Sequence, residues 1–597
     1  MSSKTRTLWS LFIVWAVITF VISYFHAFWG DEVINLIFGI GADSQYGIHG
    51  NGHPAVWFLL LRGLYAVFHK VWVLPLASYL VAAVAVWLLI FKSPFSLRFK
   101  ILFLCTNFAL YEYVVMARNY GISMLFMFIL AIVATNKRLK SHLTGPCLFV
   151  LCNINVHSVI VSVSYIFGLI LESIKDKTIL LQEKRKFLLK TSSYTIVGTV
   201  ICLLTIFPTF DTAATRPLSE ILTIGNLKNA LFISRSFGEI TYASYFGPKE
   251  KDKIHLIDSV DPNPENKDIY PLLIDNPECM DEYFSKKYTT KCVFDRAHKI
   301  KTKVLSVSKF IFTVFCSILM YVSVFSFYGE LSLFSSAVLS LFSLSFFFSF
   351  FYAGGYRHQA IWLAFMIALL WISKRNNYSF GRSIQRIRSF GYSAFIVLLV
   401  LQIWPAIYNA YNGLFGTPSS NSKQFAQFME NNNSIKNSVI ISSNDFYIVE
   451  AIHYYNNAPT FIISENKFAF TIPVSIKDNS SYSLDDILKS ANAVAFCNHV
   501  PVLILLMNAF SAEQRVLPEK ITHPTLYQFA GLINFYINPE QLARLQAQTR
   551  KIATFKETLL EPGFSVYQLL PQDAHPQKSC PSQYIFDPKM FSMADEK

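Results

Sequence analysis

The sequence predicts a polytopic α-helical membrane protein with about eleven transmembrane helices and a C-terminal extracytoplasmic α/β domain. Three observations support this prediction. Of the 597 residues, 53% are hydrophobic and only 15% are charged, whereas a soluble domain carries about 25% charged residues. Apolar segments of bilayer length recur through residues 1–410. The cations collect in short stretches between these segments, as in membrane proteins.

The net charge of +14 therefore reflects membrane topology. The sequence contains no Cys-His finger, RNA-binding signature or extended basic helix, so we expect no nucleic-acid partner.

Nine apolar segments have roughly the length that crosses a bilayer. They are 8–28, 72–91, 101–116, 120–135, 192–210, 306–328, 331–352, 358–373 and 391–410. A further stretch, 147–173, is too long for one span and carries Asn153, Asn155 and His157 in its middle. We predict two short helices that meet at these polar residues, which makes eleven spans in all.

The distribution of cations predicts the orientation. With the N-terminus in the cytoplasm, nineteen Lys and Arg residues fall in five cytoplasmic stretches. The short regions left outside hold four: Arg62, Lys70, Arg118 and Arg357. This imbalance follows the positive-inside rule. The first span has no small-residue cleavage site, so we expect a retained anchor rather than a signal peptide.

This topology divides the chain into two domains. The membrane domain covers residues 1–410, with outer juxtamembrane helices in 29–71 and a long outer loop at 211–302. Residues 411–597 form the extracytoplasmic domain. Four cysteines fall on the outer side: Cys279 and Cys292 in the loop, and Cys497 and Cys580 in the C-terminal domain. They are candidates for two disulfides on an oxidising side of the membrane, the alternative being four free thiols.

The C-terminal domain alternates strand and helix patterns. Strands are predicted at 438–443, 459–464 and 501–508, with helices at 445–457 and 483–496 between them. No glycine-rich phosphate motif opens these helices, so no nucleotide is predicted.

Two adjacent carboxylates, Asp31 and Glu32, directly follow the first span. The residues after them have helical spacing on one apolar face, which predicts a helix lying along the membrane surface: Val33, Leu36, Ile37 and Ile40. The acids are candidates for catalysis. The alternative is that they cap this helix, since acids in a first turn satisfy free N–H groups and complement the helix dipole.

Other polar residues break the apolar pattern on the same predicted side. They are His53, Arg62, Glu112, Arg118, Tyr120, His157, Arg357 and His358. Arginine presents a fork of donors that matches phosphate oxygens. A carboxylate at the same level can take a proton from an attacking hydroxyl. The combination favours transfer of a group from a lipid phosphate to an acceptor outside the cytoplasm.

The order of these motifs resembles the GT-C superfamily of integral-membrane glycosyltransferases. It is most similar to bacterial members of the protein-mannosyltransferase and aminoarabinose-transferase kind, which are glycosyltransferase family 39-like. Asp31 and Glu32 match the acids of the first outer loop. "HP" at 53–54 matches a Lys/His-Pro-Pro-Leu-like motif, although Ala55 replaces its second proline. Arg118 and Tyr120 match an Arg-x-Tyr motif, and "YRHQ" at 356–359 resembles a late Arg-His pair.

This resemblance, which covers roughly 8–410, implies a polyprenyl-phosphate sugar as donor and an acceptor that is a protein, lipid or polysaccharide. By the same resemblance Asp31 is the base, with Glu32 beside it. Arg118, Arg357, His53 and His358 hold the donor phosphate. Tyr120, Glu112, His157 and Arg62 are candidate substrate contacts. No metal and no separate cofactor are implied. We expect a bacterial inner membrane as the location.

Two other functions are consistent with a multi-pass chain. A transporter or lipid flippase would need polar or broken helices near the middle of the membrane and often an internal repeat. A scaffold would use the outer domain to bind a partner. Each polar residue also has a structural alternative: Arg118 and Arg357 as interfacial anchors, Arg118 paired with Glu112, and His157, Asn153 and Asn155 as helix–helix hydrogen-bond partners.

Overall fold

The computed structural model describes most of the chain. The described residues are 2–42, 47–175, 181–209, 230, 257–258, 296–351, 354–442, 448–463, 465–471, 480–507, 509–510, 515–516, 525–529, 533–537, 539–556, 558–561, 563–571 and 580–587.

Helices dominate as far as residue 414. In chain order they are α1 (Ser3–Phe25), α2 (Gly30–Ile40), α3 (Val56–Phe68), α4 (Val73–Lys92), α5 (Leu97–Leu104), the π-helix η1 (Phe108–Glu112), α6 (Tyr120–Thr135), α7 (Lys137–Cys152), α8 (Val156–Lys175), α9 (Leu181–Ile206), α14 (Arg296–Ser323), the 3-10 helix η2 (Val324–Phe327), α15 (Leu331–Phe350), α16 (Tyr356–Asn376), α17 (Arg382–Val400) and α18 (Ile403–Leu414).

Among the described residues, seven helices are long and apolar enough to cross a membrane, judged by length and composition. They are Ser3–Phe25, Val73–Lys92, Val156–Lys175, Gln182–Ile206, Val307–Phe327, Leu331–Phe350 and Arg382–Leu414. Helix α1 exposes a wide apolar surface that includes Ile13, Val17 and Phe20. Such a surface is stable against lipid rather than water, so the protein is membrane-embedded.

These seven helices coincide with seven of the eleven predicted spans. The other four predicted spans correspond to helices that are short, interrupted or polar at their ends. The span predicted at 101–116 is broken into α5 and η1, and α6 has only 16 residues. Helix α7 begins with cations. Helix α16 is buried almost throughout and forms the centre of the bundle.

The pair of helices predicted within 147–173 is confirmed as α7 and α8. Asn155 begins α8 as its N-cap, because its Oδ1 accepts the Ser158 N–H at 2.8 Å. Asn155 Nδ2 also donates to Ser123 Oγ at 2.8 Å. Asn153 Nδ2 donates to the Gly198 carbonyl at 3.2 Å. The two asparagines are therefore helix–helix partners, one of the alternatives considered for this polar turn.

The turns predicted on one side of the membrane meet at one end of the bundle, which we call the α2 end. There the Gly50 N–H donates to the Thr205 carbonyl at 2.9 Å, and the Val56 N–H donates to the Asn153 carbonyl at 3.3 Å. Cationic stretches meet elsewhere, since Arg375 Nη2 donates to the Lys92 carbonyl at 2.8 Å. Each of these contacts joins turns that are predicted on the same side.

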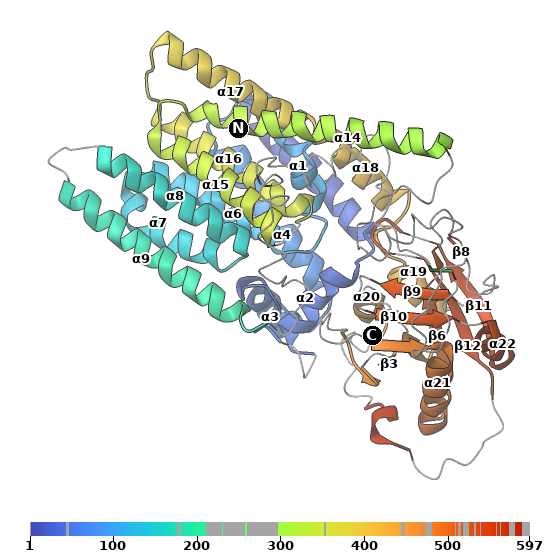
Figure 1. The fold of residues 1–597 in the computed structure, drawn as a ribbon. Coiled ribbons are helices and arrows are strands. Elements are labelled where there is room, and N and C mark those ends of the chain that lie inside the picture. The colour runs from blue at the N-terminus through green and yellow to red at the C-terminus, as the bar shows by residue number, and fades with distance from the viewer. Residues whose placement is uncertain are drawn as a thin grey trace.

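Helix α2 is covered by protein on both sides, contrary to the predicted position along the membrane surface. Val33, Leu36 and Ile37 are 0% exposed. Helix α3 and helix α20 (Ile448–Tyr455) both pack against α2, and Figure 1 shows α2 between the helical bundle and the C-terminal domain. The apolar face of α2 therefore faces protein, because α3 and α20 bury it more completely than a lipid surface would.

The predicted C-terminal α/β domain is confirmed. Its helices are α19 (Ser422–Glu430), α20, α21 (Leu484–Asn498), α22 (Pro539–Gln548) and the 3-10 helix η4 (Ser582–Tyr584). Its strands are β2 (Val439–Ser442), β3 (Thr460–Ile462), β4 (Lys467–Phe468), β5 (Ser480–Ser483), β6 (Val502–Met507), β7 (Ala509–Phe510), β8 (Arg515–Val516), β9 (Thr525–Phe529), β10 (Ile533–Ile537), β11 (Thr549–Phe555) and β12 (Phe564–Leu569).

The main sheet has the order β11-β12-β6-β2-β3-β4. Strands β6, β2 and β3 are parallel, in register through Ile440 with Thr460 and Leu503, and the outer strands are antiparallel. A second sheet, β1-β9-β10-β5, includes β1 (Ile257–Asp258) from the predicted outer loop, which pairs with β9.

One of the two candidate disulfides is present. Cys497 on α21 is bonded to Cys580, with a Cα–Cα distance of 5.6 Å. It fastens the C-terminal segment to the domain. Cys279 and Cys292 lie outside the described residues.

Candidate functional site

Asp31 and Arg118 form an ion pair at the α2 end. Asp31 lies in the first turn of α2, and Arg118 lies in the turn before α6. Arg118 Nη1 is 3.1 Å from Asp31 Oδ2 and donates a 2.5 Å hydrogen bond to the Asp31 carbonyl. The Arg118 side chain is 8% exposed and that of Asp31 is 43% exposed. The guanidinium is therefore held inside the protein, while the carboxylate is open to a reactant.

Glu32 points the other way, into the protein, and is 0% exposed. Its Oε2 lies 3.0 Å from His26 Nε2 and accepts the Trp29 N–H at 3.2 Å. Its Oε1 accepts the Ala117 N–H at 2.7 Å. Because Trp29 is the N-cap of α2, Glu32 caps this helix. Glu32 thus connects the end of α1, the start of α2 and the turn that carries Arg118. This burial favours a positioning role over proton transfer.

His53 sits at the end of a tight turn that the stretch "HGNGHP" forms. Gly50 and Gly52 adopt φ values of 81° and 80°, which glycine tolerates without steric cost. Asn51 Oδ1 accepts the His53 N–H at 2.9 Å, and Asn51 Nδ2 donates to the Gly47 carbonyl at 2.9 Å. This turn brings the half-buried imidazole within electrostatic range of Arg118 and Asp31.

The pKa of His53 is lowered to about 4, by burial first and by the Arg118 charge second, with Asp31 opposing. The imidazole is therefore neutral at neutral pH. Between the ordinary pKa of about 6.5 and about 4, the unfolded chain binds a proton at His53 that the folded protein does not. Neutral His53 therefore makes its full contribution to the free energy of unfolding above pH 6.5, and this contribution is lost as the pH falls from about 6.5 to about 4.

We expect the wild-type protein to lose more thermal stability than His53→Gln between pH 7 and pH 4.5. The measurement is the unfolding temperature of both proteins in detergent at a series of pH values. His69→Gln is the control, since His69 is exposed. Parallel curves for wild type and His53→Gln would contradict a lowered pKa.

Two more histidines continue the cluster inward. The ring centroids of His157 and His358 are 5.0 Å apart, and Tyr120 lies 5.1 Å from His358. The Gly355 N–H donates to His358 Nδ1 at 2.8 Å, so the neutral ring carries its proton on Nε2. His157 is 7% exposed, and its ring nitrogens have no hydrogen-bond partner among the described residues. His157 is thus a buried polar group that a ligand could satisfy.

Arg357 and Glu112 lie beside this cluster. The Arg357 guanidinium is 5.1 Å from the Trp29 ring centroid, and the Arg357 carbonyl accepts the Tyr113 hydroxyl at 2.8 Å. Arg357 and Arg118 are both within electrostatic range of His358, and Glu112 is within range of Arg357. Arg118 pairs with Asp31, so the alternative of an Arg118–Glu112 pair is not observed.

Arg62 is the one predicted site residue that lies away from the cluster. Its Nε donates to the Gly39 carbonyl at 2.7 Å, at the opposite end of α2 from Asp31. A cation there complements the negative end of the helix dipole. The structure thus gives Arg62 a capping role.

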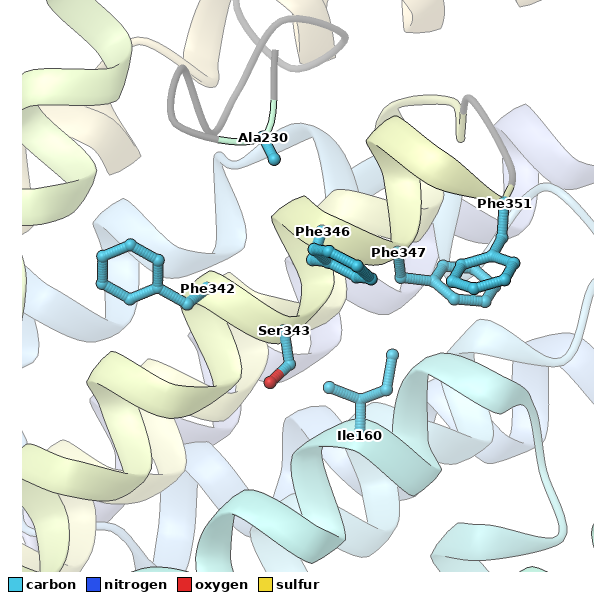
Figure 2. A pocket seen from close by; sticks show the side chains of 7 residues that line it. All are labelled: Ile160, Ala230, Phe342, Ser343, Phe346, Phe347 and Phe351. Atoms are coloured by element: carbon cyan, nitrogen blue, oxygen red, sulfur yellow. The ribbon is translucent and has the colours of Figure 1, made fainter. Parts of the chain in front are cut away.

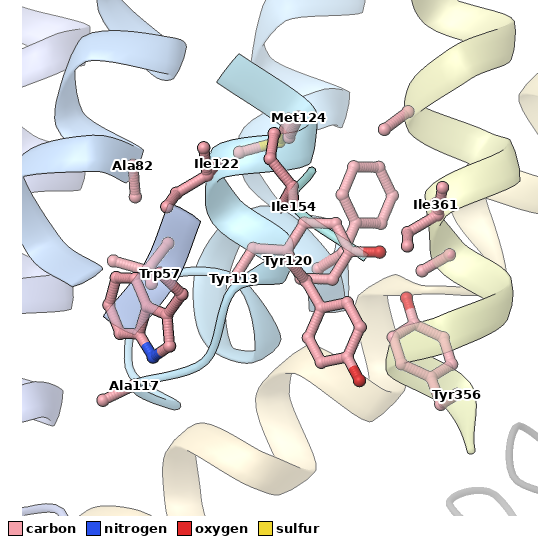
Figure 3. Close-up of a cluster of buried hydrophobic side chains, with 14 of the residues drawn as sticks. Trp57, Ala82, Tyr113, Ala117, Tyr120, Ile122, Met124, Ile154, Tyr356 and Ile361 are labelled. Carbon is pink, nitrogen blue, oxygen red and sulfur yellow. The ribbon is translucent and has the colours of Figure 1, made fainter. Parts of the chain in front are cut away.

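A layer of packed aromatic side chains lies next to the cluster. Trp57, Tyr113, Tyr120 and Tyr356 pack with Ile154 and Ile361 (Figure 3). The rings of Tyr113 and Tyr120 stack at 6.0 Å. These residues belong to α3, α6, α16, the turn between η1 and α6, and the turn between α7 and α8, so the layer joins the segments that carry the site.

An apolar groove of about 450 Å³ lies next to the cluster. It lies between α8 and α15 (Figure 2). Its lining is Ile160, Ala230, Phe342, Ser343, Phe346, Phe347 and Phe351. Phe347 also contacts His157, with ring centroids 5.3 Å apart. The groove and the histidine cluster therefore share a boundary.

Sequence reasoning did not single out His26, Tyr111 or Trp29, although His26 and Tyr111 complete the network around Glu32. The Tyr111 hydroxyl is 3.4 Å from His26 Nδ1. A polar His26 at the end of an apolar span was the only sequence signal. The hydrogen bond from the Ala117 N–H to Glu32 leaves no signal in the sequence, because every residue except proline offers such a donor.

Comparison of the chain with protein-family models, with curated proteins and with solved structures finds no match.

Proposed function

We propose that the protein is a glycosyltransferase that moves a sugar from a polyprenyl-phosphate donor to an acceptor at the α2 end of the membrane domain. One observation carries the proposal: the half-exposed Asp31 carboxylate is paired with the buried Arg118 guanidinium, at the head of a cluster of histidines and arginine. An acid that stays open to reactants beside a fixed cation is suited to proton abstraction next to a phosphate.

The groove between α8 and α15 supports a lipid donor. Its phenylalanine lining offers an apolar surface to an isoprenoid chain, and Phe347 connects it to His157. A chain lying in this groove would bring its phosphate to the histidines and to Arg357 and Arg118. Arginine and a neutral His358 presenting Nε2–H are hydrogen-bond donors, as phosphate oxygens require.

In the proposed reaction Asp31 takes the proton of the acceptor hydroxyl or amine. The acceptor atom then bonds to the anomeric carbon of the sugar, while the bond from that carbon to the phosphate oxygen breaks. Polyprenyl phosphate leaves with the bonding electron pair, and the guanidinium groups neutralise its charge. Glu32 holds the turn that carries Arg118 against α2 during these steps.

The test is transfer by the purified protein in liposomes, with a panel of polyprenyl-phosphate sugars labelled in the sugar and an extract of envelope acceptors. We expect release of polyprenyl phosphate together with labelled acceptor. Mass spectrometry of glycolipids and glycoproteins from cells with and without the gene identifies the acceptor. Intact labelled lipid that moves across the bilayer with every donor would instead indicate a flippase.

Blocking the groove should weaken donor use. Ser343 lines the groove, and Ser343→Trp places an indole in it. We expect the donor KM to rise by about tenfold or more, equivalent to about 1.4 kcal/mol of binding, with a smaller change in kcat. Ser335→Trp on the same helix is the matched control, because Ser335 is outside the groove lining. Equal donor KM values in the two variants would remove the groove from the proposal.

A further inference from the structure

The backbone of Phe28 is held by the C-terminal domain on both sides. The Phe28 N–H donates to the Tyr455 hydroxyl oxygen at 2.9 Å, and Ser422 Oγ donates to the Phe28 carbonyl at 2.8 Å. The Phe28 ring packs against Tyr454 at 4.6 Å. Phe28 is 4% exposed and Ser422 is 0% exposed. The bond from Ser422 is therefore buried and the bond to Tyr455 is partly buried, and a backbone group left unpaired at such a site is costly.

Phe28 occupies the short non-helical turn between α1, which ends at Phe25, and α2, which begins at Gly30. The next residue, Trp29, is the N-cap of α2, and Asp31 lies in the first turn. A helix starts where its N-cap is placed, so the position of Phe28 decides where the Asp31 carboxylate points.

A third contact between the C-terminal domain and the site does not involve Phe28. Ser419 Oγ lies 3.3 Å from the Tyr111 hydroxyl, which lies 3.4 Å from His26 Nδ1. His26 in turn contacts Glu32, the residue that caps α2 and binds the Ala117 N–H. A continuous chain of polar contacts thus runs from the C-terminal domain to both sides of the Asp31–Arg118 pair.

The segment that carries Ser419 and Ser422 is hydrogen-bonded to another part of the C-terminal domain. Thr558 Oγ1 donates to the Ser419 carbonyl at 3.0 Å, and the Leu559 N–H donates to the Pro418 carbonyl at 3.0 Å. Asn421 Nδ2 donates to the Lys556 carbonyl at 2.6 Å. The segment that carries Ser419 and Ser422 is therefore tied to the residues that follow β11, part of the main sheet.

We infer that the C-terminal domain positions the catalytic turn, with Tyr455 and Ser422 as positioning residues that hold Asp31 in line with Arg118. The inference rests on the proposed function for its effect on turnover. This role differs from two others that the extracytoplasmic domain could have, which are to cover the membrane domain and to bind the acceptor. Neither of those roles requires the domain to hold the turn at Phe28. The domain orders the base without contacting the substrate.

The test compares Tyr455→Phe with Tyr454→Phe. Both remove one hydroxyl from α20 and keep the ring, but the Tyr454 hydroxyl has no hydrogen bond among the described residues. We expect Tyr455→Phe to speed amide exchange in peptides covering residues 24–32 by about tenfold. We also expect it to lower kcat by about 10- to 100-fold at an unchanged donor KM. Tyr454→Phe should leave all three values at the wild-type level, and Ser422→Ala should act as Tyr455→Phe does.

The inference is overturned by unchanged exchange in residues 24–32 of Tyr455→Phe, and equally by faster exchange with wild-type kcat. A fall in kcat accompanied by an equal rise in donor KM would also count against it, because that pattern indicates a damaged binding site. Failure of the wild-type protein to use any lipid-linked sugar would sink the proposed function alone, since amide exchange reports on the turn without any substrate.

Discussion

Asp31→Asn should abolish nearly all transfer while the protein stays folded and binds its donor. Asparagine keeps the size of the side chain and its position in the first turn of α2, but it cannot accept a proton from the acceptor. General-base catalysis typically contributes about 100- to 10,000-fold, so kcat should fall by about that factor. The measurement is donor turnover in liposomes, with donor binding followed separately by displacement of a labelled polyprenyl phosphate.

The matched control is Glu112→Gln, a carboxylate-to-amide change at a neighbouring acid that makes no ion pair with Arg118. It should retain far more activity than Asp31→Asn. Full turnover by Asp31→Asn would remove Asp31 from the role of base. Lost donor binding in that variant would indicate that Asp31 serves mainly to hold Arg118.

Glu32→Ala should destabilise the protein by about 3–5 kcal/mol, the usual cost of removing one partner from a buried charged network. The substitution leaves the Trp29 and Ala117 N–H groups and the His26 ring without their shared acceptor. Glu32 is fully buried, so bulk solvent does not take over as acceptor for these groups. The free energy of unfolding, measured by denaturant titration in detergent, is the readout.

The adjacent acid supplies the comparison. Asp31→Ala removes a carboxylate that is 43% exposed, and Arg118 keeps its hydrogen bond to the backbone carbonyl of residue 31, so we expect a much smaller loss of stability than at Glu32. Two neighbouring carboxylates should therefore give opposite results, with stability lost at Glu32 and activity lost at Asp31. Equal stability of Glu32→Ala and Asp31→Ala would show that the network around Glu32 is not what joins α1, α2 and the Arg118 turn.

Much of the helical architecture could be predicted because its signals are local. Spans of bilayer length, the polar turn at Asn153 and Asn155, and the strand–helix alternation after residue 438 each depend on residues close together in sequence. The count of spans was harder to predict. Helix α16 has polar ends and is buried by the surrounding helices. It therefore does not need the continuous apolar surface by which a lipid-facing span is recognised.

The candidate site was predictable in part for a related reason. Charged residues and histidines are costly to bury, so their presence at the ends of apolar segments indicates a specific role. On this ground the sequence points to His53, Arg118, His157 and Arg357 as candidate site residues. Their grouping depends on how turns far apart in sequence meet. Arg62, like Arg118, is a cation that departs from the charge pattern on the predicted outer side. The structure nevertheless places it beside Gly39, at the other end of α2 from Asp31.

By itself the sequence determined that the chain is membrane-embedded, roughly where its long apolar helices and three strands of the main sheet lie, and that Asp31 and Glu32 start a helix. These properties follow from hydrophobicity and from side-chain periodicity along one segment. Only the tertiary structure decided that Asp31 opens outward while Glu32 is buried, that α20 covers α2, and that Tyr455 holds Phe28. These outcomes depend on backbone N–H and C=O groups of distant segments, which are chemically alike at nearly every residue and so leave no trace in the order of amino acids.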